Sequence, residues 1–384
     1  MGKIIGRKII FNKKREIVSN KLMQENNKLA LDYVNKNIEN LSPKVPAYIT
    51  LNRYLFSNLD TIENIKDKIM LEVISDEITL KDLMKVKDRG FILTLKFNDT
   101  KFDKYSDDDL DMLINICKEV HLSSKFFDIE DIKSIQSEFK NKTICIEDIS
   151  TLENFYEYDK LENLIFEGMF FIKPEIIPGK RITSNTLNVI EVIKMLNQDE
   201  FVSNFKLEMK LKESPDLIFN LLKFINSAEF SFRKKITSIS QVIALIGVRR
   251  LDHIIRLFIG TSQDSNKFGM LVSEKATIRG NIMELLAKKL DNKNREYAYI
   301  TGIFSLMDSL FNVPIENIIN STNLHENIVN GLLDKTSDLG KLLLITKKLE
   351  TFNEKDINEV SLKTSLSLIE IKYILNKAVF INVI

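Results

Sequence analysis

The first part of the chain alternates short apolar runs, rich in Ile, Phe and Thr, with stretches of helical periodicity. The apolar runs predict strands over 3–11, 16–23, 46–51, 69–74, 91–97, 124–129 and 142–149. The stretches between them predict helices over 25–40, 77–88, 107–120 and 130–140. Repeated strand–helix units are typical of an α/β domain with a parallel sheet or barrel.

A second pattern begins after residues 174–187, where two prolines, a glycine and several hydroxyl or amide residues predict a linker. Beyond it the apolar residues recur with helical period. Helices are expected near 186–196, 200–211, 215–227, 238–245, 248–260, 267–290, 294–310, 314–320, 324–333, 337–350, 354–360 and 365–379. We therefore predict an α/β domain at 1–178 and an all-α domain at 179–384.

The composition of the chain indicates which kinds of binding partner and which cellular compartment to expect. The chain has 384 residues with 55 basic and 54 acidic side chains, so no global field favours nucleic acid as a partner. The two cysteines, Cys117 and Cys145, have no CxxC spacing and fit a reducing compartment. Because no apolar run approaches the roughly 20 residues of a spanning helix, we expect a cytoplasmic protein without membrane insertion.

Common catalytic signatures are absent from the sequence. It contains no GxxxxGK[ST], GxGxxG, HExxH or GxSxG motif. The three histidines, His121, His253 and His325, are dispersed, and none is followed by Asp. A metal-dependent phosphohydrolase needs several imidazole and carboxylate ligands that converge on its ions. We therefore expect no histidine-based metal site in the helical half, and no cofactor.

The segment LLKFINSAEFSFRKKITSISQVIALIGVRRL (221–251) has a distinctive layout. One helix ends at Asn226-Ser227-Ala228, and a later one is broken at Gly247. This layout resembles the HDOD domain, a relative of the HD phosphohydrolases in bacterial signalling proteins. A helix-ending turn with tight packing at Ala228 explains the same three residues without a ligand.

The likeness to HDOD domains covers about 184–384, including AYITGIFSLMDSLFNVPIENIIN (298–320). The resemblance implies that Ser305 and Leu306 stand where HD hydrolases have their His-Asp metal pair. It also implies that Arg279 stands near another metal histidine. These replacements leave no metal ligands in the helical half.

The end of the α/β half, IFEGMFFIKPEII (165–177), resembles the end of EAL domains, the cyclic di-GMP phosphodiesterase fold, with Glu167 in place of a Gln. The whole chain resembles the YuxH-like family, in which a degenerate EAL domain is fused to an HDOD domain. A full (β/α)8 barrel typically has about 250 residues. We therefore expect an incomplete EAL-type barrel followed by the HDOD helices.

EAL chemistry uses carboxylates and an amide oxygen to hold two divalent ions. The resemblance places Asn20-Lys21-Leu22 on the name-giving Glu-Xaa-Leu, so the first metal carboxylate is missing. It assigns Asn52, Glu72 and Glu147 to other ligand positions. The two glutamates also fit strand-end carboxylates with only a structural role.

Other EAL positions depart further from the family pattern. Where the Asp-Asp pair should follow the strand 91–97, the chain has Lys96-Phe97, with Asp99 two residues on. Lys125 and Asp128 have altered spacing. Because several carboxylates are missing from one two-ion site, we expect no ion binding and no catalytic residue.

A basic strip is the remaining candidate site. Arg249, His253 and Arg256 share a helix face, with Arg250 beside them. The strip fits either a solvated face or a site for an anion, a nucleotide or an acidic partner.

The leading hypothesis is a non-enzymatic signalling adaptor that binds other signalling proteins. This hypothesis is motivated by one shared feature of the two halves. Both resemble metal-dependent phosphohydrolases, and both lack the metal ligands of those enzymes. One alternative is residual cyclic di-GMP phosphodiesterase activity through Glu72, Glu147 and Asn52. Another is a metal-independent cyclic di-GMP receptor.

Overall fold

The computed structural model describes residues 4–24, 27–42, 44–74, 78–97, 106–139, 141–196, 204–214, 217–218, 221–222, 225, 236, 238–260, 266–322 and 324–380. The chain forms two compact units. One unit comprises Met1–Phe171 and Leu375–Val383, and the other comprises Ile172–Ile374 and Ile384. The sequence-based boundary between residues 178 and 179 stays a prediction.

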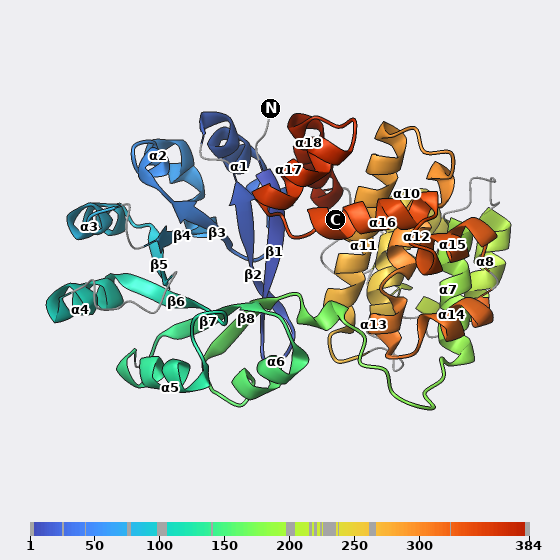
Figure 1. Ribbon diagram of the computed structural model, residues 1–384, viewed down its shortest axis with the longest axis horizontal. Coiled ribbons are helices and arrows are strands. Elements are labelled where there is room, and N and C mark those ends of the chain that lie inside the picture. The colour runs from blue at the N-terminus through green and yellow to red at the C-terminus, as the bar shows by residue number, and fades with distance from the viewer. Residues whose placement is uncertain are drawn as a thin grey trace. The chain divides into compact units, whose positions relative to one another are not determined.

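The first unit is built on a closed barrel of eight strands that follow one another in sequence order (Figure 1). β1 runs antiparallel to both of its neighbours, β2 and β8, and the other neighbouring pairs are parallel. The strands are β1 (Ile4–Asn12), β2 (Ile17–Gln24), β3 (Ala47–Leu51), β4 (Ile69–Ile74), β5 (Ile92–Phe97), β6 (Cys117–Ser123), β7 (Thr143–Ile149) and β8 (Leu164–Gly168).

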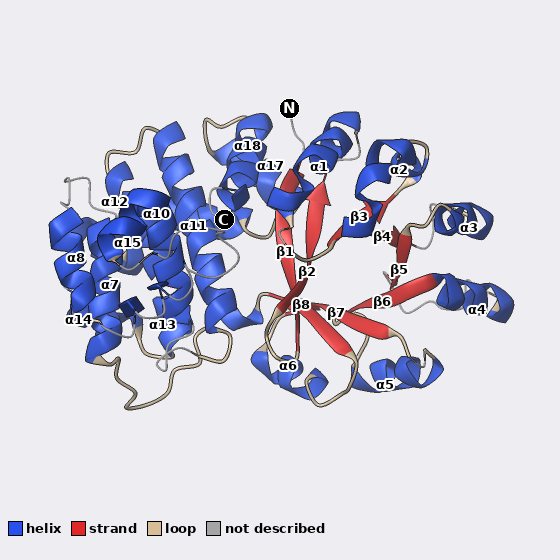
Figure 2. Ribbon diagram, turned by 180° about the vertical axis from the view of Figure 1, so that it is seen from behind, coloured by secondary structure: helices blue, strands red, loops and turns tan. Residues whose placement is uncertain are grey.

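Helices surround the ring of strands on its outside (Figure 2). They are α1 (Lys28–Leu41), α2 (Arg53–Phe56), η1 (Leu59–Lys68), α3 (Leu80–Asp88), α4 (Asp107–Ile116), α5 (Ile129–Glu138) and α6 (Leu152–Tyr158), with η3 (Phe170–Ile172) after β8. The side chains of Asn27, Thr79, Ser106, Asp128 and Thr151 cap α1, α3, α4, α5 and α6 by accepting backbone N–H groups. These are preferred N-cap residues, so short polar side chains define where most of these helices begin.

Two predictions for the barrel need correction. The predicted strand 124–129 is wrong, because β6 occupies Cys117–Ser123 and Asp128 already caps α5. The predicted helix 107–120 is too long, since α4 ends at Ile116. The cause is the polar interior of the barrel, which gives β6 alternating charged and apolar positions instead of an apolar run.

The expected incompleteness does not extend to the strands, because all eight are present and the ring closes. The N-terminal half is short because β1 and β2 form a hairpin where a full barrel has a strand–helix unit. The helical connections are also short, and α2 has only four residues.

The second unit is all-helical, as predicted. Its helices are α7 (Ser184–Leu196), α8 (Asn204–Lys212), α10 (Ile239–Gly260), α11 (Gly269–Lys289), α12 (Arg295–Phe304), α13 (Met307–Phe311), α14 (Ile315–Thr322), α15 (Glu326–Leu333), α16 (Asp338–Leu349), α17 (Glu354–Lys363) and the first part of α18 (Leu368–Phe380), which passes into the first unit at Leu375. The predicted break at Gly247 is confirmed, since α10 is kinked there with φ at 77°. Most of the predicted helix 215–227 lies outside the described residues.

The core of the helical unit is organised around α11, which contacts α10, α12, α13 and α16. At the crossing with α12, a Cβ atom on Gly302 would lie 2.7 Å from the Cα atom of Gly280. The two glycines therefore allow the helix backbones to approach closely. Among the described residues no single helix is long and apolar enough to cross a membrane, although the bent pair Arg295–Phe311 and Ile315–Thr322 passes by length and composition.

Candidate functional site

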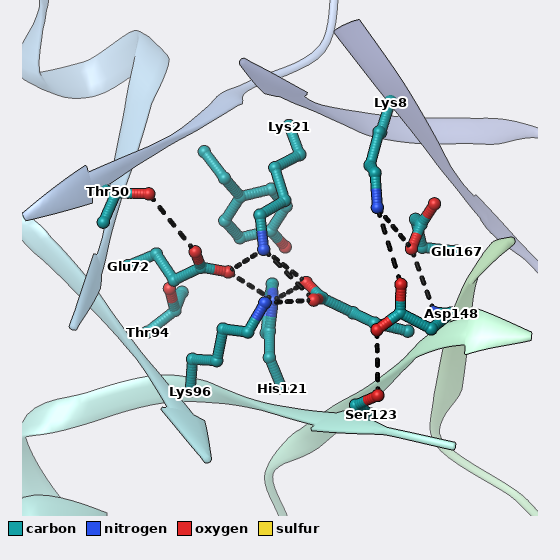
Figure 3. Close-up of polar contacts among 12 residues, drawn as sticks. Lys8, Lys21, Thr50, Glu72, Thr94, Lys96, His121, Ser123, Asp148 and Glu167 are labelled. Atoms are coloured by element: carbon teal, nitrogen blue, oxygen red, sulfur yellow. Dashed lines mark hydrogen bonds and ion pairs between the residues drawn. The ribbon is translucent and has the colours of Figure 1, made fainter. Parts of the chain in front are cut away.

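Five side chains near the carboxyl ends of five strands meet inside the barrel (Figure 3). They come from β2, β4, β5, β6 and β7, and we call them the interior cluster: Lys21, Glu72, Lys96, His121 and Glu147. Side chains of a strand alternate between its two faces, so each strand contributes these residues to the interior and apolar neighbours to the helix-facing side. All five are buried except Lys96, which is partly exposed.

Lys21 joins the two carboxylates of the cluster. Its Nζ atom lies 2.5 Å from Glu72 Oε1 and 2.8 Å and 3.1 Å from the two carboxylate oxygens of Glu147. Lys96 Nζ lies 2.6 Å from Glu147 Oε2. Figure 3 shows the Lys21 ammonium directed toward the Glu72 carboxylate. Two lysines thus occupy the space in which these carboxylates would hold a cation.

His121 supplies another positive charge from β6. Its Nδ1 atom lies 2.9 Å from Glu147 Oε1 and 3.2 Å from Glu72 Oε1. Burial alone would lower the pKa of His121, but its carboxylate neighbours, Glu119 among them, outweigh burial and raise the pKa to about 10. The imidazole is therefore cationic at neutral pH.

The carboxylates of the cluster are ionised. Burial alone would raise the pKa of Glu72, but the adjacent Lys21 ammonium and His121 lower it to about 2. Lys21 and His121 likewise overcome burial and hold the pKa of Glu147 well below its usual range. With Glu119, which accepts a hydrogen bond from the Tyr48 hydroxyl, three carboxylates balance the charges of Lys21, Lys96 and His121.

A second polar group lies beside the cluster, and we call it the rim group: Lys8, Ser123, Lys125, Asp148 and Glu167. Lys8 Nζ lies 3.5 Å from Glu167 and 3.6 Å from Asp148. The Asp148 backbone N–H donates to Glu167 Oε2, and the Ser123 hydroxyl donates to Asp148. Asp148 has a φ of 59°, an unfavourable conformation for a non-glycine residue that these bonds hold in place.

The structure brings together two of the three predicted vestigial ligands. Glu72 and Glu147 share Lys21, whereas Asn52 caps α2, its amide oxygen accepting the Leu55 N–H at 2.8 Å. Asn20, assigned to the first metal carboxylate, donates instead to the Ser42 hydroxyl.

Of the other positions assigned from the EAL pattern, Lys21 and Lys96 belong to the interior cluster, and Lys125 and Asp128 do not. Asp128 caps α5 in a capping box with Asp131, and Lys125 pairs with Asp148 in the rim group. Asp99 lies outside the described residues.

The helical unit leaves several predicted site residues undescribed. Asn226, Ser227 and Ala228 lie outside the described residues. The basic strip lies on α10, and the side chains of its members are also outside the described part: Arg249, Arg250, His253 and Arg256.

The three positions linked to the HD metal site are described. Arg279 is buried and bonds Glu350 and Ser305, and Leu306 is buried in the core. A guanidinium with its carboxylate partner therefore occupies this part of the helical unit.

One group in the described residues has the right donor types for a metal ion: His121, Cys145 and Glu147, with donor atoms within 4.8 Å of one another. In a tetrahedral zinc site, neighbouring donor atoms lie only about 3.5 Å apart. Burial raises the pKa of the Cys145 thiol, which opposes the thiolate that zinc requires. An ion there would also approach the Lys21 ammonium, so the residues do not fit a metal while Lys21 holds its place.

Sequence reasoning missed the roles of Lys21 and His121. In the sequence His121 is one of three dispersed histidines, although Glu119, His121 and Ser123 stand at alternate positions and so share one strand face. Three polar residues on one face of a buried strand are a signal for a polar barrel interior. For Lys21 the signal was weaker, because its partners lie 51 and 126 residues away.

Comparisons with known proteins relate the helical unit to a domain family and the whole chain to a bacterial protein. Residues 185–313 match the HDOD domain family. The chain is 24% identical over 393 residues to the uncharacterized protein YuxH of Bacillus subtilis, covering 94% of this chain and 93% of YuxH. The HDOD match lies within the helical unit, and the match to YuxH extends over both units, in line with the resemblance predicted from the sequence.

Two further matches are shorter. The chain is 22% identical over 244 residues to the cyclic di-GMP phosphodiesterase CdgJ of Vibrio cholerae, covering 63% of this chain and 56% of CdgJ. Among solved structures, an EAL domain protein from Listeria monocytogenes matches with a TM-score of 0.34 and 14% identity, covering 44% of this chain and 86% of that one.

Proposed function

We propose that this chain is a non-catalytic protein of cyclic di-GMP signalling that acts by binding other regulatory proteins. The link to cyclic di-GMP rests on its similarity to CdgJ, a cyclic di-GMP phosphodiesterase. One observation carries the non-catalytic part: the Lys21 ammonium is bonded to both Glu72 and Glu147 inside the barrel.

The charge balance supports this proposal. Three cationic side chains already neutralise three carboxylates, so two divalent ions would add four uncompensated positive charges to a buried site. Two-ion hydrolysis uses metal charge to activate water and to stabilise the leaving oxygen. Lysine can neutralise a carboxylate, but it supplies no open coordination position for a water molecule.

A hydrolysis assay tests the proposal. Purified full-length protein is incubated with cyclic di-GMP and Mg²⁺ or Mn²⁺, with CdgJ as the positive control. We expect no more turnover than with the Glu72→Gln/Glu147→Gln variant. Turnover by the wild-type chain that disappears in Glu72→Gln would refute the proposal.

The partner-binding part has its own test, directed at the basic strip. A pull-down from the native cell is compared between the wild-type chain and the Arg249→Glu/Arg256→Glu variant. A partner captured by the wild-type chain and lost in the variant would place the binding surface on this face of α10. Unchanged partners would mean that the strip is a solvated face.

A second candidate function is metal-independent binding of cyclic di-GMP at the barrel. The exposure of three lysine side chains favours it: Lys8 and Lys125 of the rim group are 27% and 64% exposed, and Lys96 of the interior cluster is 19% exposed. Ammonium groups there could contact phosphate oxygens where a hydrolase would use metal ions.

Calorimetric titration with cyclic di-GMP in EDTA tests the second candidate. It predicts binding that is weakened at least tenfold in Lys96→Gln and unchanged in Lys133→Gln, whose lysine pairs with Glu130 on the outer helix α5. No heat at high micromolar ligand would eliminate it.

A further inference from the structure

Arg279 lies in the middle of α11 and is among the largest fully buried side chains of the described residues. A guanidinium stays charged at all accessible pH values, so burying it requires a partner that satisfies both its charge and its N–H groups. The burial of Arg279 in the helical unit therefore requires partners that accept its hydrogen bonds and balance its charge.

Its principal partner is Glu350. Arg279 Nε donates to Glu350 Oε1 at 2.9 Å and Nη2 donates to Oε2 at 2.7 Å, a bidentate pair between two buried side chains. Nη1 donates to the Ser305 hydroxyl at 3.0 Å. The planar fork of arginine matches a carboxylate in this way, and lysine cannot reproduce it.

Both partners stand at helix C-termini. Ser305 follows the last residue of α12, and Glu350 follows the last residue of α16. The C-terminus of a helix carries partial negative charge, so a cation is favoured there. One guanidinium on α11 thus interacts with the ends of two other helices.

A second cation on α11 contacts the same junction. Lys275 precedes Arg279 by one turn, is buried, and has its Nζ atom 5.6 Å from the centre of the Phe352 ring, within cation–π range. Phe352 is itself buried and has a φ of 54°, an unfavourable conformation for a bulky residue. Glu350 and Phe352 both belong to the short junction between α16 and α17.

We propose that Arg279 and Lys275 form a two-point clamp that fixes the α16–α17 junction on α11 and thereby sets the position of α17. When the ion pair between Arg279 and Glu350 is broken, the α16–α17 junction is no longer held on α11. The clamp does not depend on the proposed function of the barrel, because its residues all belong to the helical unit.

Amide hydrogen exchange on the full-length chain tests the clamp. In Arg279→Met and Glu350→Gln, we expect the α17 amides to exchange at least about 100-fold faster, the change that corresponds to breaking a buried ion pair. Exchange in α15 should change much less, and exchange in α1 of the barrel should stay unchanged.

Thr277→Val is the matched control, because Thr277 is a buried α11 residue whose hydroxyl donates to Ser273 in the same helix. It should leave α17 exchange at the wild-type rate. Unchanged α17 exchange in both test variants would overturn the proposal, as would equal acceleration of α15 and α17.

If Arg279→Met does not fold, Arg279→Lys decides the matter. It keeps the positive charge but loses the bidentate geometry. Faster exchange confined to α17 would support the clamp, and wild-type exchange would overturn it.

Discussion

At the scale of single residues, the central feature is an ammonium group between two buried carboxylates. Desolvating such groups is costly, and their mutual attraction compensates only with good geometry. Lys21 meets that condition, with bonds to Glu72 and Glu147 between 2.5 and 3.1 Å. Removing it alone therefore leaves buried negative charge without its main partner.

We predict that Lys21→Met lowers the free energy of unfolding by about 3–5 kcal/mol, the usual cost of breaking a buried ion pair from one side. Chemical denaturation of the full-length chain measures the change. Lys66→Met is the control, because its partly exposed pair with Glu63 should contribute less than about 1 kcal/mol. If Lys21→Met lowered the free energy of unfolding by less than about 1 kcal/mol, the interior cluster would not stabilise the barrel as predicted.

His121 gives the barrel a predictable pH dependence. Its pKa is about 10 in the folded protein and about 6.5 in an unfolded chain, so the folded state binds the proton more tightly. The stabilisation is fully present below pH 6.5 and is lost as the pH rises toward 10. This difference in the pKa of His121 lowers the free energy of unfolding by up to about 5 kcal/mol between pH 6.5 and pH 10.

Unfolding free energies at several pH values between 6.5 and 10 test this prediction. The wild-type chain should lose stability across the interval, and His121→Gln should show a flatter curve. Parallel curves for the two proteins would show that His121 does not carry the proton.

At the scale of elements, the sequence predicted the structure best where local chemistry defines it. Capped helices α1, α3 and α5 begin within three residues of the predicted helices 25–40, 77–88 and 130–140, and β1 and β2 match the predicted strands 3–11 and 16–23. β6 was missed because its interior face carries Glu119 and His121, whose partners come from other strands. The alternation of Glu119, His121 and Ser123 indicates one face of a strand, but no local pattern identifies the partners of these side chains.

The α11–α12 crossing yields a prediction about packing. A methyl group on Gly302 would contact the Gly280 backbone at 2.7–2.8 Å, so Gly302→Ala must push the helices apart. We expect a loss of about 1–3 kcal/mol in the free energy of unfolding, as for other overpacked cores. Thermal unfolding measures it.

Glu296→Ala, at an exposed position of the same helix, is the control for this variant and should change stability by less than about 0.5 kcal/mol. Equal effects of the two substitutions would mean that the close approach of the helices is not required.

At the scale of the whole molecule, each unit supplies its own internal cation: Lys21 in the barrel and Arg279 in the helical unit. The sequence identified Glu72 and Glu147 because carboxylates at strand ends fit a known pattern. It did not identify the lysine between them, because that contact requires β2, β4 and β7 to face one interior. The loss of metal-ligand residues can be recognised from a sequence. The side chains that take their place in the site are identified only from the folded structure.

The most direct test of the account is Mn²⁺ binding to the full-length protein, followed by electron paramagnetic resonance of the free ion. We predict no stoichiometric binding by the wild-type chain at millimolar Mn²⁺, because the Lys21 ammonium and its neighbours already neutralise the carboxylates. Stoichiometric binding by the wild-type chain that is lost in the Glu72→Gln/Glu147→Gln variant would contradict the account.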